Sequence, residues 1–169
     1  MAVIEVRTDD LAFVEADAIA RPVDAELRAT TPLLRRLEIA GGEALARHLR
    51  INEPLAIGSA VVTPAGALSV ELLIHAVVSS ETEAVSRASV RQAVTSALQR
   101  AGDWGIEHLA MTPFGTGVGN LDIEDSAEVM GDLLRRHAQT GRSPKTITIV
   151  VESEFEQGVF ERIVSGAAT

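Results

Sequence analysis

Residues 145–151 form a near-continuous apolar run, rich in β-branched residues, in the last part of the chain. Such a run is typical of a strand that is buried on both faces, as in sheets that carry helices on both sides. Strand-like and helix-like segments alternate along the rest of the chain, without an internal repeat or a long linker. We therefore predict a single α/β domain over residues 1–169, with three layers (α/β/α) around a central mixed sheet.

The periodicity of apolar residues predicts the individual elements. Strands are expected at residues 2–6, 16–20, 57–63, 72–78, 108–113 and 145–151. Helices are expected from Pro32 with an interruption at Gly41-Gly42, over residues 90–101 with a stop at Gly102, from near Asp122 to about Gly141, and around residues 159–163.

The composition excludes several classes of function. The chain has no cysteine, so it has no disulfide framework and no thiol nucleophile, and its four histidines lack metal-ligand spacing. We expect neither a metal nor a cofactor. A net charge of −9 argues against general nucleic-acid binding. Because we see no signal peptide and no run long enough to span a membrane, we expect a cytoplasmic protein without membrane association.

The candidate binding segment is the ten-residue stretch 111–120, Met-Thr-Pro-Phe-Gly-Thr-Gly-Val-Gly-Asn. It lies between a predicted strand and a predicted helix. Glycines at alternate positions let the backbone adopt unusual conformations and let a ligand approach closely. The N-terminus of the following helix offers unpaired N–H groups and a positive dipole end. These features indicate a phosphate or pyrophosphate cradle, and the alternative is a tight structural turn.

Several motifs, in this order, resemble the macro domain family. They are Thr8-Asp-Asp-Leu11, Ala16-Asp-Ala-Ile19, Gly58-Ser-Ala-Val-Val-Thr-Pro64, Leu73-Ile-His-Ala-Val77 and Pro113-Phe-Gly-Thr-Gly-Val-Gly119. Members of this family are α/β/α modules that bind ADP-ribose and in some cases hydrolyse its conjugates. The resemblance covers nearly the whole chain. It implies a small-molecule nucleotide such as ADP-ribose as the partner, and it leaves an oligomer open.

The resemblance also implies which residues bind the ligand. They are Asp10, Leu11, Phe114, Gly115, Thr116, Gly117, Val118, Gly119 and Asn120. Asp10 resembles the family's acceptor for the adenine amino group, and its alternative is a residue of an Asx-type turn. Phe114 either lines a ligand pocket or closes the end of its strand.

The first ligand loop departs from the family pattern. The family's Asn-Ala-Ala-Asn is Arg21-Pro-Val-Asp24 here, and residues around Arg28-Ala-Thr-Thr31 replace a glycine triplet. Asp24 stands at the position of the catalytic Asn, so it is the candidate catalytic residue. Helix capping or solvent exposure is the competing interpretation. The aromatic residue that often stacks on adenine falls at Val151 or Glu152, and His75 is interpreted as a hydrogen-bonded core histidine.

Three functions remain, and we rank them by these motifs. The retained glycine loop favours a binding module for ADP-ribose or a related nucleotide diphosphate. The second reading is a macro-fold protein that has lost ligand binding and acts as a scaffold or oligomer. The third is an ADP-ribosyl or O-acetyl-ADP-ribose hydrolase. It ranks last because such chemistry needs accurate positioning of substrate and water, and the rewritten loop removes part of that machinery.

Overall fold

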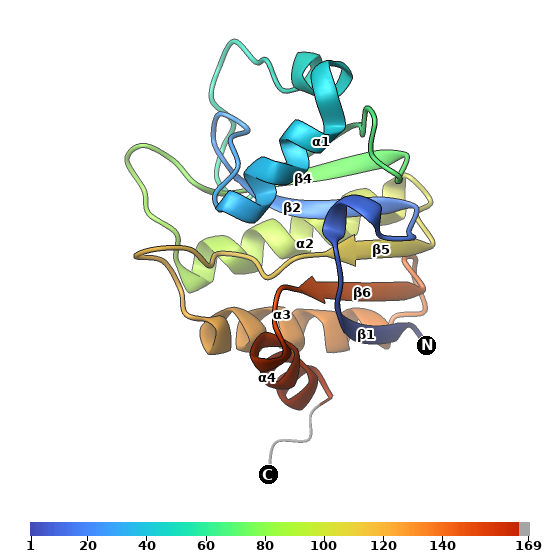
Figure 1. The fold of residues 1–169 in the computed structure, drawn as a ribbon. Coiled ribbons are helices and arrows are strands. Elements are labelled where there is room, and N and C mark those ends of the chain that lie inside the picture. The colour runs from blue at the N-terminus through green and yellow to red at the C-terminus, as the bar shows by residue number, and fades with distance from the viewer. Residues whose placement is uncertain (166–169) are drawn as a thin grey trace.

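Six strands form one sheet at the centre of the computed structural model, which describes residues 1–165 (Figure 1). In chain order the elements are β1 (Val3–Thr8), the 3-10 helix η1 (Leu11–Phe13), β2 (Ala18–Asp24), α1 (Pro32–His48), β3 (Ala60–Pro64), β4 (Leu72–Ser79), α2 (Arg87–Asp103), β5 (His108–Met111), α3 (Ile123–Ala138), β6 (Thr146–Val151) and α4 (Glu154–Val164). Their order across the sheet is β1-β6-β5-β2-β4-β3. All neighbouring strands are parallel except β3 and β4, so the sheet is mixed, as predicted.

Helices cover both faces of the sheet. The larger core lies between one face and helices α2, α3 and α4, whereas the smaller core lies between the other face and α1 with η1. Strand β6 contributes to both, since Ile147 and Ile149 belong to the larger core and Val150 to the smaller one. This confirms the three-layer prediction and the two-sided burial of the last strand. Within residues 1–165, no helix is both long enough and apolar enough to cross a membrane.

Strand β2 extends four residues beyond its predicted end. The prediction followed the short apolar run, which ends at Ala20, and a proline such as Pro22 is rarely found in a central strand. Beyond Ala20, however, β4 is the only described strand that pairs with β2, because the pairing of β2 with β5 ends at the Ala20–Met111 pair. One side of β2 is therefore unpaired at Pro22, and the strand continues to Asp24.

Other predicted boundaries were also wrong: β1 ends at Thr8 rather than at residue 6, and β5 ends at Met111 rather than at residue 113. The backbone N–H of Ser59 donates to the carbonyl of Ala56, so residues before Ala60 form a turn, and β3 begins later than expected. Helix α2 continues through Gly102, and the left-handed residue that follows it is Gly105, with φ of 66°. The interruption predicted at Gly41-Gly42 is confirmed, since Gly42 kinks α1 with φ of 70°.

Candidate functional site

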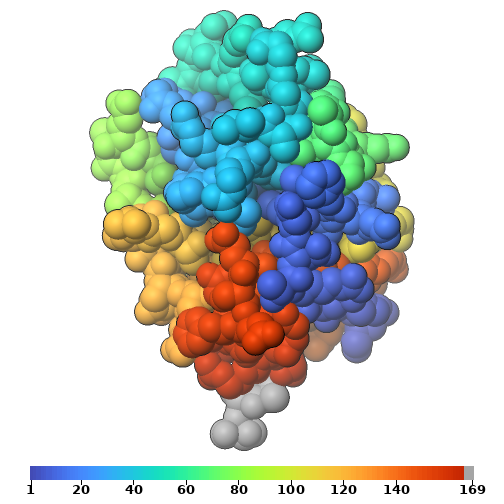
Figure 2. Space-filling model, in the orientation of Figure 1, coloured from blue at the N-terminus to red at the C-terminus, as the bar shows by residue number. Residues whose placement is uncertain are grey.

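The carboxyl ends of five parallel strands meet at one edge of the sheet, and the predicted binding segments follow them there. The glycine loop follows β5, Asp10 follows β1, and Asp24 ends β2. Figure 2 shows four of these segments meeting on one face: the light-blue start of α1, the orange-yellow glycine loop, the red-orange residues after β6 and the dark-blue segment after β1. Ligand sites in open α/β sheets lie at this kind of edge.

The glycine loop depends on conformations that favour glycine. Gly115, Gly117 and Gly119 have φ of 83°, 131° and 78°. Two nested turns hold the loop, in which the N–H of Asn120 donates to Gly117 (3.1 Å) and the N–H of Leu121 donates to Gly115 (3.0 Å). Residues 117–120 are exposed at the end of an inner strand. The predicted placement of this loop is therefore confirmed.

The loop itself supplies unpaired hydrogen-bond donors. Within residues 1–165, no acceptor bonds to the backbone N–H groups of Thr116, Gly117, Val118 or Gly119. The start of α3 contributes less than expected, because Asp122 caps it and its first turn contains two further acidic residues. Those carboxylates already complement the positive end of the helix dipole. An anion at this edge would be held by the loop rather than by α3.

A small cavity of about 40 Å³ separates the glycine loop from the start of α1. A Cβ added at Gly117 would lie 3.4 Å from the carbonyl oxygen of Thr30, so the two loops nearly touch. Thr112 lines this cavity, and Thr30 belongs to the opposing loop. Both hydroxyls are buried and have no partner among the described residues. Buried polar groups are nearly always paired, so two unpaired hydroxyls beside the glycine loop are unusual.

A second hollow of about 240 Å³ lies beside the first, between η1 and α1. Asp10 and Leu11 line it, as predicted binding residues. Asp10 is exposed, and one oxygen of its carboxylate accepts from the N–H of Ala12 (3.0 Å), so it does serve as a turn residue. The side chain of Leu11 packs in the smaller core.

Phe114 is fully buried in the larger core rather than exposed to either hollow. Its N–H donates to the sulfur of Met130 (3.2 Å), and its carbonyl accepts from the hydroxyl of Ser126 (2.7 Å). The ring therefore anchors the start of the glycine loop. In contrast, the side chain of Val118 is fully exposed at the tip of the loop.

Asp24 holds the rewritten first loop in shape. Its Oδ1 accepts from the N–H groups of Glu26 (2.8 Å) and Arg28 (3.0 Å). Leu27 between them has φ of 63° and inserts its side chain into a small apolar cluster with Val23. The carboxylate is thus part of a tight turn. It does not cap a helix, as the competing interpretation predicted, because α1 begins at Pro32 and has Thr31 as its N-cap.

A family comparison identifies this arrangement. The model of the family described as Macro domain matches residues 24–130. The chain belongs to the macro domain family.

Curated relatives of this macro domain include uncharacterized proteins. One from Mycobacterium tuberculosis is 32% identical over 169 residues, which are 100% of this chain and 47% of that protein. The chain therefore spans about half the length of its mycobacterial relatives. A protein from Aeropyrum pernix is 29% identical over 170 residues and is matched over 87% of its length by 95% of this chain.

Solved structures agree with the fold of this macro domain. The Oceanobacillus iheyensis macrodomain with ADP superposes with a TM-score of 0.85 at 17% identity, covering 97% of this chain and 90% of that one. The Trypanosoma brucei macrodomain in complex with ADP gives 0.84 at 15% identity, covering 96% and 69%. At this identity, the likeness concerns the fold.

A buried polar network lies beneath the first loop of this macro domain. Arg21, which is fully buried, donates from Nε to Nδ1 of His75 (2.9 Å), from Nη1 to Oε1 of Glu38 in α1 (2.6 Å) and from Nη2 to the carbonyl of Leu27 (3.3 Å). Because Arg21 can only donate, Nδ1 of His75 is the acceptor and its Nε2 carries the proton. Nε2 then donates to the hydroxyl of Thr63 (2.8 Å).

The network makes His75 a hydrogen-bonded core residue, as the sequence indicated. Burial, with the neighbouring Arg21 guanidinium, lowers the pKa of His75 well below its ordinary value. Burial also lowers the pKa of Arg21, which Glu38 partly opposes. Sequence reasoning missed the burial of Arg21. The available signal was an arginine directly after the apolar run Ala18-Ile-Ala20.

The free energy of unfolding is expected to decrease as the pH is lowered, because of His75. Its folded pKa lies below the unfolded value of about 6.5, so on acidification the unfolded chain takes up the proton first. The contribution is complete above about pH 6.5 and declines below it, by up to roughly 1.4 kcal/mol per pH unit. Urea unfolding at about pH 7.5, 6.5 and 5.5 measures this slope.

The matched variant is His75→Asn, whose Oδ1 can still accept from Arg21 but does not titrate. Its stability should depend less on pH between about 6.5 and 5.5 than that of the parent protein. An unchanged dependence would assign the effect to another group.

Proposed function

We propose that this macro domain is a binding module for ADP-ribose or a related nucleotide diphosphate. The observation that carries the proposal is the glycine loop, which has four consecutive unpaired N–H groups within the described residues and lies at the edge of the sheet where ligands of such folds bind. The unpartnered hydroxyls of Thr112 and Thr30 add further polar groups beside it. Backbone donors can bind an anion without a basic surface, which suits a chain of net charge −9.

Structural neighbours support the same ligand class. The Oceanobacillus iheyensis protein has been solved with ADP and, as a mutant, with ADPR. In our proposal the diphosphate lies along the glycine loop and the nucleoside lies toward Asp10. A cavity of about 40 Å³ is too small for a diphosphate, so in our proposal the glycine loop and the start of α1 move apart when the ligand binds. Loop rearrangements of this kind accompany a substantial minority of complexes.

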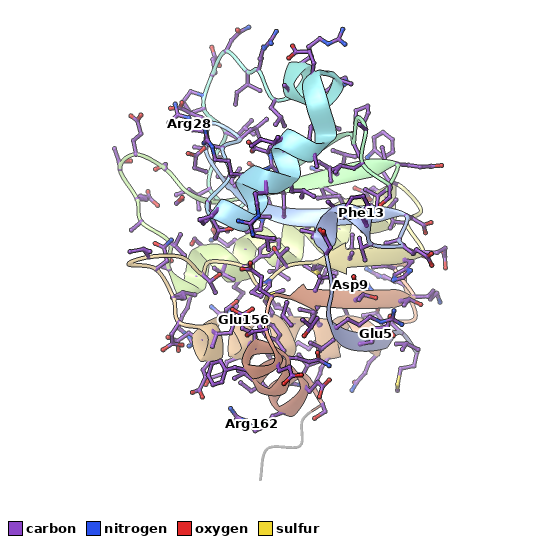
Figure 3. All side chains as sticks on the ribbon, in the orientation of Figure 1. Glu5, Asp9, Phe13, Arg28, Glu156 and Arg162 are labelled. Atoms are coloured by element: carbon purple, nitrogen blue, oxygen red, sulfur yellow. The ribbon has the colours of Figure 1, made fainter. Side chains whose placement is uncertain are left out.

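The narrow cleft also favours the second candidate, a macro fold that no longer binds nucleotides and acts as a scaffold or oligomer. Glu152 and Glu156 lie in the cavity wall, where their charge opposes an anion. Figure 3 labels Glu156 on α4, below the start of α1.

Titration calorimetry distinguishes the two candidates. The protein is titrated with ADP-ribose, AMP, ADP and NAD. If the protein is a binding module, its dissociation constant for ADP-ribose should be below about 1 mM, which corresponds to a binding free energy of roughly −4 kcal/mol. Absence of heat across the whole panel, with folded protein, contradicts the first candidate and favours the second.

Hydrolysis of ADP-ribosyl esters or O-acetyl-ADP-ribose is expected to be very weak or absent. Oδ1 of Asp24 is already bonded to two backbone N–H groups, and the family's amide side chain is missing at this position. Misplacement of a substrate by about 1 Å can reduce the rate on the order of a hundredfold. Single-turnover assays compare the parent with Asp24→Ala, which removes the candidate catalytic carboxylate. Rapid turnover by the parent that this change abolishes would support the hydrolase instead.

A further inference from the structure

The hollow between η1 and α1 has the size of a subsite for one ring system. Its volume is about 240 Å³, whereas pockets that hold a whole drug-sized ligand span about 300–1,000 Å³. Leu11, Leu33 and Leu37 give it an apolar wall. A flat heteroaromatic ring can therefore lose water there without leaving many polar groups unpaired.

Phe13 stands at the mouth of this hollow with 75% of its surface exposed. It belongs to η1, and Figure 3 shows it on the segment that joins β1 to β2, near Asp9. An exposed aromatic ring next to an apolar wall offers a stacking surface, and base–aromatic stacking is a general means of holding nucleotides.

Arg36 also lines the hollow, from one turn further along α1 than Leu33. Its guanidinium lies 3.5 Å from a carboxylate oxygen of Glu152, at the long end of the hydrogen-bond range. Both side chains are more than half exposed, so the ion pair adds little stability. It does restrain the guanidinium beside the hollow, and a guanidinium plane stacks well on aromatic rings.

We propose that Phe13 and Arg36 hold the base of the bound nucleotide, Phe13 through its ring and Arg36 through the plane of its guanidinium. This inference rests on the proposed nucleotide-binding function. Arg36 and Glu152 thereby take the part of the stacking aromatic residue that the sequence lacks at Val151 and Glu152. Purines stack over a larger area than pyrimidines, so an adenine nucleotide binds better than the matching uracil nucleotide.

Calorimetry on four single variants tests the proposal. Phe13→Ala and Arg36→Ala are each expected to weaken ADP-ribose binding about 5- to 100-fold, the range for loss of one base-stacking partner. The matched controls are Arg35→Ala, the exposed neighbouring arginine of α1, and Phe155→Ala, which removes an equally exposed ring from α4. The controls should bind within about twofold of the parent.

Two further measurements separate stacking from charge. Arg36→Lys keeps the positive charge but loses the planar guanidinium group. The affinity of this variant for ADP-ribose should therefore fall as in Arg36→Ala. UDP-ribose should bind more weakly than ADP-ribose to the parent, and Phe13→Ala should reduce that difference. Parent-like affinity in Arg36→Lys, or equal losses in the variants and their controls, overturns the base-holding role while nucleotide binding stands. A parent protein that binds no nucleotide overturns both proposals.

Discussion

Replacing Arg21 by methionine should lower the free energy of unfolding by about 3 kcal/mol. This is the largest effect on stability that we expect from a single substitution of a buried residue. The change leaves Nδ1 of His75 without its donor and removes the cation that faces Glu38. It also frees the carbonyl of Leu27 in the first loop. Native domains are stable by only about 5–15 kcal/mol, so urea unfolding should show a clearly lower midpoint.

Arg7→Met is the matched control. Arg7 is an exposed strand arginine, and its Nη2 lies 3.4 Å from Oε2 of Glu5. Such surface ion pairs contribute about 0–1 kcal/mol to the free energy of unfolding. The double variant Arg21→Met with Glu38→Gln should recover part of the loss, because no unpaired carboxylate remains. If Arg21→Met unfolds at the same urea concentration as Arg7→Met, the network does not stabilise the fold.

Gly117→Val should weaken ADP-ribose binding at least about tenfold with little change in the fold. At φ of 131° a β-branched residue is strained, by about 1–3 kcal/mol for such conformations, so the loop must change shape. The new side chain would also crowd Asn120 and Thr30 in the narrow cleft. Both effects displace the N–H groups that are proposed to contact the diphosphate. Calorimetry gives the affinity, and urea unfolding gives the stability.

Gly141→Val provides the control, because Gly141 also has positive φ (71°) and no heavy atom within 4 Å of an added Cβ, but lies outside the site. It should keep the parent affinity while carrying a similar backbone strain. Unchanged affinity in Gly117→Val would show that the phosphate loop had been assigned wrongly.

The sequence predicted those features that depend on neighbouring residues. A strand followed by alternate glycines and an acidic helix start is a local pattern, and it placed the loop of residues 115–120 correctly. The β-branched run at residues 145–151 likewise indicated burial on both faces, because side chains alternate along a strand. Local pattern and tertiary structure agree at both places.

The missed features depend on residues that are distant in the chain. Arg21 is buried because His75 and Glu38, 54 and 17 residues away, accept its hydrogen bonds, and apolar periodicity carries no such information. The continuation of β2 past Pro22 depends on where β5 stops pairing. Closure of the cleft depends on Gly117 meeting Thr30, a contact between two separate loops.

The position of β1 at one edge of the sheet affects how the chain folds during synthesis. Its only partner among the described strands is β6, so Val3 must wait for Thr146 before it can pair. At translation rates of about 5–20 residues per second, that interval is roughly 7–30 s. During this interval, the backbone of β1 has no neighbouring strand with which to form hydrogen bonds. Contacts this distant in sequence are closed late and slow the folding of a domain.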